Sequence, residues 1–291
     1  MRGVNMGDHK IYQLIENSGY LPKIPKDVGE VLEMLNSPVE LDIDMLIEKV
    51  SNTEQLNELM IRNLNSGYFQ LSKRIDTIRE AIIYLGMHTV QNLLIFFITS
   101  QLFNNLREKR LRIFTMKRYW NHVLGTSVAS CMISSRIKVS DRYKLFSYGL
   151  IHDIGIAVLD TCLPELIDKI TEKLQNGTHQ IIAERIVLGG ITHSDIGAWL
   201  CRKWNLRDDI VNIVEFHHTP FLAKSNNDEL KIIHLADVIS TDYYEKLFGL
   251  NLNHGMNTKI MNSLGIAEND IQVISEVLPK ELEKLSGYFS L

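Results

Sequence analysis

The sequence has few of the residues that mark secreted, membrane-spanning or β-rich proteins. Only three cysteines occur among 291 residues, and they lie far apart, which argues against a disulfide framework and a paired-thiolate metal site. The longest apolar run, residues 93–103, contains Thr99, Ser100 and Gln101 and is shorter than the roughly 20 apolar residues that cross a bilayer. The N-terminal residues carry no apolar signal core. We therefore expect a cytoplasmic protein with no membrane partner.

An excess of positive charge is also missing. The formal net charge is −4, from 31 Lys and Arg against 35 Asp and Glu, so no nucleic-acid partner is expected. The densest cationic segment, residues 107–118, reads REKRLRIFTMKR and contains only one aromatic residue, Phe114, so it offers no series of rings for stacking. We interpret this segment as a solvated junction between two helical halves.

Alternating strand patterns are nearly absent, and the chain has only six prolines. Helical spacing is present instead, as in residues 28–35, where valine and leucine recur at i, i+3, i+4 and i+7. Residues 77–103 read as two helices with a break near Gly86. We predict an all-α fold of two packed helical lobes, residues 8–110 and residues 111–291, joined by a short helical connection.

Two further signals predict where helices begin in the second half. Thr192 and Asp195 have the spacing of a capping box, so a helix is expected to start at His193. Asp228 is a plausible N-cap for the long amphipathic segment that follows it.

The stretch YGLIHDIGIAVLD, residues 148–160, is almost wholly apolar yet contains an adjacent His152 and Asp153. Burying a carboxylate costs several kcal/mol unless it finds a partner or a metal ion. Consecutive helical residues point about 100° apart, so this pair can hold one ion only near a helix end or a helix crossing. Gly149 and Gly155 flank the pair and would let neighbouring helices come close.

Other histidines and aspartates of the second half also fall in apolar surroundings or at predicted helix ends. The candidate metal ligands are His122, His152, Asp153, His193, His217, His218 and Asp237. His234 lies one helical turn before Asp237 and would orient that carboxylate rather than bind the ion. Imidazole and carboxylate together suit a divalent transition metal, Fe, Mn, Zn or Ni, as one or two ions. The alternative is that these histidines are core residues that hydrogen-bond to the backbone and bind no metal.

The order His122, His152-Asp153, Asp237 resembles the H…HD…D signature of the HD phosphohydrolase superfamily. His193, His217 and His218 are similar to the further histidines of its HD-GYP branch, which hydrolyses cyclic dinucleotides. Two departures argue against that activity: Ile156 stands where the branch has a lysine, and HHTPFLAKSNN stands where it has the GYP segment.

A resemblance to the HDOD family, the HD-related output domain of bacterial signalling proteins, extends over nearly the whole chain. The segments that carry it are IPKDVGEVLEMLNSP, RNLNSGYF, TIREAIIYLGMHTVQNLL, YGLIHDIG, THSDIGAWLCRKWNL and EFHHTP. The resemblance implies an all-α fold with an HD-domain-like C-terminal lobe, a bacterial cytosolic setting and a regulatory role.

Two functions remain open from the sequence. The first is a signal-transduction protein that acts through protein–protein interaction with signalling proteins, with a metal in the HD-like site. The second is a metal-dependent phosphohydrolase acting on a phosphoester or a (cyclic) nucleotide, in which Asp153 would be the catalytic residue, and Arg185 or Lys231 would replace the lysine. At the C-terminus, Tyr288 and Phe289 would either dock on the body or form a homo-oligomer contact.

Overall fold

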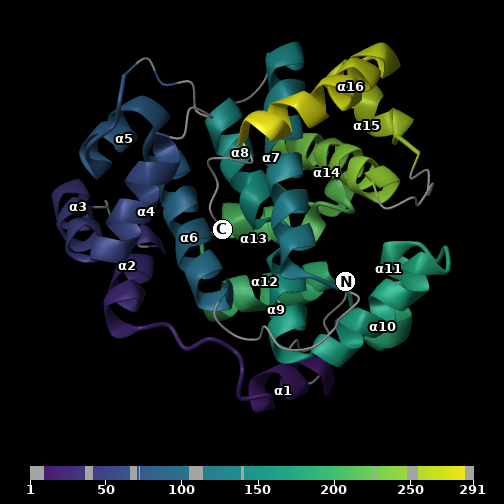
Figure 1. The fold of residues 1–291 in the computed structure, drawn as a ribbon, viewed down its shortest axis with the longest axis horizontal. Coiled ribbons are helices and arrows are strands. Elements are labelled where there is room, and N and C mark those ends of the chain that lie inside the picture. The colour runs from purple at the N-terminus through teal and green to yellow at the C-terminus, as the bar shows by residue number, and fades with distance from the viewer. Residues whose placement is uncertain are drawn as a thin grey trace.

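The computed structural model describes residues 10–36, 42–65, 71, 73–104, 114–138, 141–225, 227–247 and 255–285, and these residues form helices and no strand. Figure 1 shows their arrangement. The helices are α1 (Lys10–Asn17), α2 (Lys26–Asn36), α3 (Ile43–Asn52), α4 (Glu54–Leu64), α5 (Ile78–Leu85), α6 (Met87–Asn104), α7 (Met116–Ile137), α8 (Arg142–Ile151), α9 (Ile154–Cys162), α10 (Pro164–Gln175), α11 (Gln180–Val187), α12 (His193–Lys203), α13 (Asp208–Phe216), the 3-10 turn η1 (Pro220–Leu222), α14 (Asn227–Leu247), α15 (Thr258–Leu264) and α16 (Glu268–Leu285). The prediction of an all-α fold is confirmed.

Local signals account for several helix boundaries. Gly86 has a φ of +80° and separates α5 from α6, as its position in the sequence predicts. The predicted capping box is present at the start of α12, where Asp195 accepts hydrogen bonds from the Thr192 backbone N–H (2.8 Å) and hydroxyl (2.9 Å). The N-cap prediction for Asp228 is wrong, because α14 already begins at Asn227 and Asp228 lies in its first turn.

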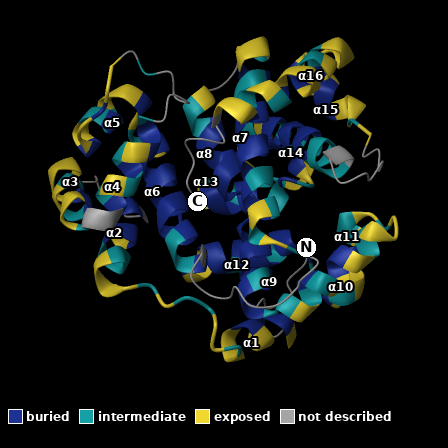
Figure 2. Ribbon diagram, viewed as in Figure 1, coloured by how far each residue is buried: buried dark blue, intermediate teal, exposed yellow. Residues whose placement is uncertain are grey.

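Helix α7 lies at the centre of the molecule, packed against α8 on one side and α14 on the other. Helix α6 packs against α8, and α2, α4 and α5 pack against α6 on its other side (Figure 1). Every residue from Val90 to Ser100 of α6 is buried, as expected for a helix that is covered all round. Figure 2 shows the same pattern, with the central helices dark blue and the outer faces of α3, α5 and α16 largely yellow.

The buried apolar side chains form one core cluster that runs from Ile11 to Leu282. The predicted junction at residues 110 and 111 and most of the cationic segment lie outside the described residues, so the division into two lobes stays a prediction. Tyr288 and Phe289 also lie outside them.

One described stretch, Arg142–Cys162, is long and apolar enough to cross a membrane by length and composition, with a mean hydropathy of 1.2. Its most apolar part is 94% buried inside the molecule, which is the behaviour of a core segment. The stretch is also interrupted at His152 and Asp153, where α8 ends and α9 begins.

Candidate metal centre

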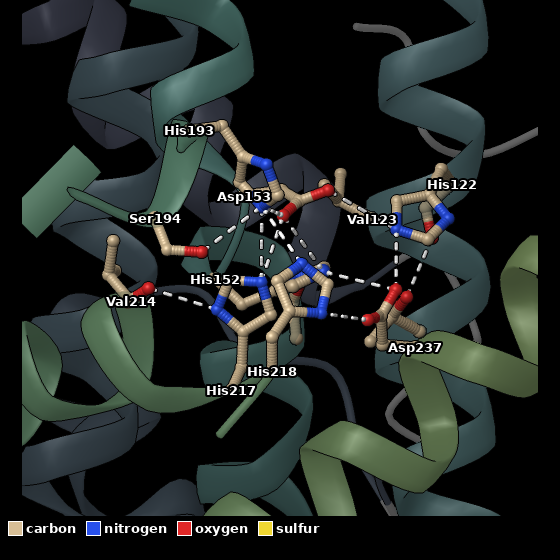
Figure 3. A network of polar contacts seen from close by, with 12 residues as sticks. His122, Val123, His152, Asp153, His193, Ser194, Val214, His217, His218 and Asp237 are labelled. Atoms are coloured by element: carbon tan, nitrogen blue, oxygen red, sulfur yellow. Dashed lines mark hydrogen bonds and ion pairs between the residues drawn. The ribbon is translucent and has the colours of Figure 1, made fainter. Parts of the chain in front are cut away.

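The predicted site residues come from six helices and lie together in the interior (Figure 3). His152 is the C-cap of α8 and Asp153 is the N-cap of α9, so the pair sits at a helix break, the arrangement that lets adjacent residues face one point. His193 opens α12, and His217 follows the last residue of α13. The remaining members, His122 on α7, His218 after α13 and Asp237 on α14, complete the group.

Close helix contacts at glycine bring these ends together. A Cβ atom on Gly155 would lie 1.9 Å from the carbonyl oxygen of His193, so α9 and α12 can meet only without a side chain there. A Cβ atom on Gly149 would lie 2.6 Å from the Cα of Ser127, which fixes the approach of α8 to α7. The expectation that these two glycines permit close packing beside the His-Asp pair is confirmed.

Asp153 lies at the centre of the cluster. Its Oδ1 faces three imidazoles, with the Nε2 atoms of His193 at 3.0 Å, His217 at 3.3 Å and His152 at 3.5 Å. Its Oδ2 lies 3.4 Å from Nε2 of His122. Because the two oxygens face different histidines, the carboxylate stands between two possible groups of ligands.

Asp237 closes the other end of the cluster. Its Oδ1 lies 3.2 Å from Nε2 of His122 and 3.9 Å from Nε2 of His152, and its Oδ2 lies 3.5 Å from Nδ1 of His218. The side chains of His122 and His218 are 17% and 23% exposed, whereas those of both aspartates are 8% exposed. The cluster is therefore buried, and it comes closest to solvent at His122 and His218.

In three of the histidines, one ring nitrogen has a hydrogen-bond partner and the other faces Asp153. Nδ1 of His152 lies 2.7 Å from the carbonyl oxygen of Gly149, and Nδ1 of His217 lies 2.9 Å from that of Val214. A carbonyl oxygen only accepts, so each Nδ1 carries the proton and each Nε2 keeps a lone pair. Nδ1 of His193 faces the Glu184 carboxylate at 2.7 Å. This is the tautomer that metal-binding histidines adopt.

Two buried atoms at the centre have no hydrogen bond of good geometry among the described residues: Nε2 of His152, and Oδ1 of Asp153, which lies 3.0 Å from Nε2 of His193. The Nε2 atoms of His217 and His218 also lie only 3.3 Å and 3.1 Å from Nε2 of His193. Lone pairs and a carboxylate oxygen directed at one buried point are unfavourable without a cation between them. The donor set therefore fits a divalent metal ion, and His122, His152, Asp153, His193, His217, His218 and Asp237 are the residues that would hold it.

The pKa shifts follow from burial and the two carboxylates. Burial would raise the pKa values of Asp153 and Asp237, but the facing histidines hold both well below the usual range. Burial lowers the pKa of His152 to about 4. At His122 burial acts in the same direction, but hydrogen bonding to both aspartates outweighs it and raises the pKa to about 9. Burial would also lower the pKa of His193, but Glu184 and Asp153 hold it well above its usual value. The ionised carboxylates and neutral His152 are in the protonation state that metal ligands need, whereas His122 and His193 would have to release a proton when an ion binds.

Glu184 of α11 is a site residue that the sequence analysis missed. It is 0% exposed, and its two oxygens lie 2.7 Å and 2.8 Å from Nδ1 of His193. One of them also accepts the His193 backbone N–H at 2.9 Å. A carboxylate on the outer nitrogen of a ligating histidine fixes its tautomer and increases its basicity. In the sequence of α11, QIIAERIV, the glutamate is followed directly by Arg185, so no signal marked this carboxylate as the buried one.

His234 lies beside the cluster. Its Nδ1 lies 2.8 Å from the carbonyl oxygen of His217, so its hydrogen bond supports the backbone of a candidate ligand, and its orientation of Asp237 stays a prediction. Neither proposed replacement for the missing lysine is shown at the centre. Arg185 is exposed on α11, and Lys231 donates to Asp228 at 3.3 Å.

Three known proteins illustrate the similarity. An uncharacterised protein of Treponema pallidum is 25% identical over 210 residues, which cover 68% of this chain and 37% of that protein. The chain thus spans little more than a third of that relative. A solved structure from Shewanella amazonensis, named a "putative phosphohydrolase", matches with a TM-score of 0.66 and 21% identity over 95% of this chain and 98% of that chain. One from Marinobacter aquaeolei, named a "putative signal transduction protein", matches with a TM-score of 0.69 and 16% identity over 96% and 60%.

At these identities the two solved structures establish the fold alone. The family model of the HDOD domain matches residues 21–220, which is more than half of the chain and includes all of the site residues except Asp237 and the neighbouring His234. This chain therefore belongs to the HDOD domain family.

Proposed function

We propose that this chain is a regulatory module of bacterial signalling that holds a divalent transition metal in its His/Asp cluster and acts by binding other signalling proteins in the cytoplasm. The observation that carries the metal part is the set of Nε2 atoms of His152, His193 and His217, all directed at the buried Oδ1 of Asp153. Membership of the HDOD family and the name of the Marinobacter structure support the signalling part.

The alternative that these are ordinary core histidines accounts for only one nitrogen of each ring. The backbone satisfies Nδ1 of His152 and His217, as a core histidine would require, but Nε2 of His152 has no hydrogen-bond partner among the described residues. A bound cation supplies the missing interaction for Nε2 and for Oδ1 of Asp153. Fe, Mn, Zn and Ni all suit these ligands, and Asp153 faces both groups of histidines, so one ion or two can be held.

Metal content of the purified protein tests this proposal. Wild type is expected to carry about one or two equivalents of a transition metal per chain, measured by plasma mass spectrometry, and Asp153→Ala is expected to carry almost none. A folded wild-type protein that contains no metal, and that binds none of Mn, Fe, Zn or Ni in calorimetry, would contradict it.

The signalling role is tested separately by affinity capture with the metal-loaded protein. A specific partner that is retained by wild type and lost by Asp153→Ala would support a metal-dependent regulatory module. If no partner is retained, or if the same partners are retained regardless of metal, the proposed role is wrong even if the metal is present.

A second candidate function is a metal-dependent phosphohydrolase. It is favoured by the complete set of histidines and aspartates and by the partial exposure of the cluster at His122 and His218. A bound metal would lower the pKa of a coordinated water and bind phosphate oxygens. Ile156 is 7% exposed and supplies no positive charge, and the ion-pair contacts of Asp153 and Asp237 among the described residues are with histidines.

Turnover of phosphate monoesters, diesters and cyclic dinucleotides with added Mn or Fe decides this candidate. Hydrolysis by wild type that is lost in Asp153→Ala would establish the enzyme. Absence of turnover on the whole panel by metal-loaded wild type would leave the regulatory function alone.

A further inference from the structure

A largely buried polar network joins the N-terminal half of the chain to the helices that carry the metal centre. Its central residue is Arg207, the N-cap of α13. The guanidinium donates from Nη1 to the amide oxygen of Gln91 at 2.7 Å and from Nη2 to that of Asn92 at 2.6 Å. Both acceptors belong to α6, and Asn92 is 0% exposed. Arg207 therefore fixes the start of α13 to a helix that precedes it by more than a hundred residues.

The same guanidinium also holds α8 through Asp209. Nε and Nη2 of Arg207 each lie 3.0 Å from an oxygen of the Asp209 carboxylate, and Asp209 accepts the Tyr148 hydroxyl at 2.7 Å. Asn92 donates directly to the Ser147 hydroxyl of α8 at 3.0 Å. A planar guanidinium is the side chain that can satisfy three acceptors at fixed angles, so lysine would not reproduce these contacts.

Both helices held by this network end at the metal centre. The backbone N–H of His152 donates to the carbonyl of Tyr148 at 3.0 Å, so the network contacts α8 one turn before the His-Asp pair. Helix α13 lies between its N-cap, Arg207, and its C-cap, His217, and its 9 residues span about 14 Å. A shift of α6 would therefore be transmitted along two short rigid helices to His152, Asp153, His217 and His218.

We propose that Arg207 is a positioning residue that couples α6 of the N-terminal half to the affinity of the metal centre. The inference rests on the proposed metal site, and it adds a means by which structural changes in the N-terminal helices would alter the metal affinity of that site. Such coupling is reciprocal, so metal binding must stabilise α6 by the same free energy with which ordered α6 favours metal binding.

Hydrogen exchange measured by mass spectrometry, with and without Zn, tests this coupling. In wild type, Zn is expected to slow amide exchange several-fold in peptides from Met87–Asn104 of α6. In Arg207→Met this slowing should disappear, and the dissociation constant for Zn should rise about 2- to 30-fold, the range of measured coupling energies. Arg207→Lys should behave like Arg207→Met, since lysine keeps the positive charge but loses the planar guanidinium and its several hydrogen-bond donors.

The matched control is Arg202→Met. Arg202 pairs with Glu215 of α13, so this substitution also removes an arginine that contacts α13, but at a more exposed position. Arg202→Met should keep both the Zn affinity and the slowing of exchange in α6. Slowing that persists in Arg207→Met, or that is lost equally in Arg202→Met, would overturn the proposal.

A readout without metal separates this inference from the proposed function. Asn92→Ala removes the α6 side chain that contacts both Arg207 and Ser147 of α8, and it should speed amide exchange in the peptide of residues 148–153 in metal-free protein, whereas Arg202→Met should not. Unchanged exchange there would overturn the coupling. If Asn92→Ala has the expected effect but wild type binds no metal, the proposed metal site has failed and the link between α6 and the cluster remains.

Discussion

The two halves of this molecule bury different kinds of polar side chain. In the described residues up to Asn104, the buried polar side chains are neutral, as with Asn63, Thr99 and Ser100. Each of these three donates to a backbone carbonyl of its own helix, at 2.7 to 2.9 Å. Beyond residue 150 the buried polar set includes the ionisable residues His152, Asp153, Glu184, His193, His217 and Asp237.

This difference separates a region built for packing from one built to hold charge. The buried hydroxyls of Thr99 and Ser100 are satisfied within their own helix, and Asn63 leaves only a neutral amide oxygen without a hydrogen bond among the described residues. A buried carboxylate needs a counter-charge as well as hydrogen bonds, and the histidines alone leave Oδ1 of Asp153 without a hydrogen bond. Matched substitutions in the two halves therefore test whether this difference in buried polar groups has the expected consequences.

The largest difference is expected for aspartate. Asp153→Ala removes the oxygens that face His122, His152, His193 and His217, and it should weaken metal binding by more than about 100-fold, beyond the effect of residues that only orient a ligand. Asp44→Ala in α3 removes an exposed carboxylate that pairs with Arg79 and should leave metal binding unchanged. Calorimetric titration with Zn measures both; equal affinities would show that the buried cluster is not the metal site.

A smaller difference is expected for glutamate. Glu184→Gln removes the negative charge behind His193 while keeping one hydrogen-bond acceptor, so metal affinity should fall by about 10- to 100-fold. Glu172→Gln, an exposed position on α10, should change nothing in the same titration. An affinity that is retained in Glu184→Gln would mean that His193 does not bind the ion through Nε2.

The smallest difference is expected for glycine. Substitution by alanine should lower the free energy of unfolding at one glycine and raise it at another. Gly155→Ala forces α9 away from the His193 carbonyl and should lower the free energy of unfolding by about 1–3 kcal/mol. Gly29→Ala in α2 meets only Ile24, at 3.6 Å, and should raise it by about 0.5–1 kcal/mol, because alanine is the better helix former. Urea denaturation of the two variants measures both; destabilisation by Gly29→Ala would contradict the looser packing of this position.

Much of the fold was predictable because helix boundaries depend on nearby residues. The φ of Gly86 and the Thr192–Asp195 capping box depend on contacts within three or four residues. The N-cap prediction for Asp228 failed by two residues, since it required the helix to begin at Glu229 and α14 begins at Asn227.

The residues that would bind the metal were predictable from the sequence, but the residues that position them were not. His152 and Asp153 could be recognised because an unpaired carboxylate in an apolar run needs an explanation. Glu184 and Arg207 gave no such signal, because each is an ordinary charged residue in its own segment and gains its role only from a distant partner, His193 or Asn92.

The amino-acid sequence alone indicated that the chain is helical and that its second half buries ionisable groups, and its resemblance to the HD superfamily indicated which histidines and aspartates gather there. Periodicity and local composition carry the helical pattern within a few residues. The arrangement of the helices was needed to show which nitrogen of each imidazole faces Asp153, and that α6 is tied to α13 through Arg207. Those outcomes depend on how helices distant in the sequence cross, and the spacing of residues within one helix carries no information about that crossing.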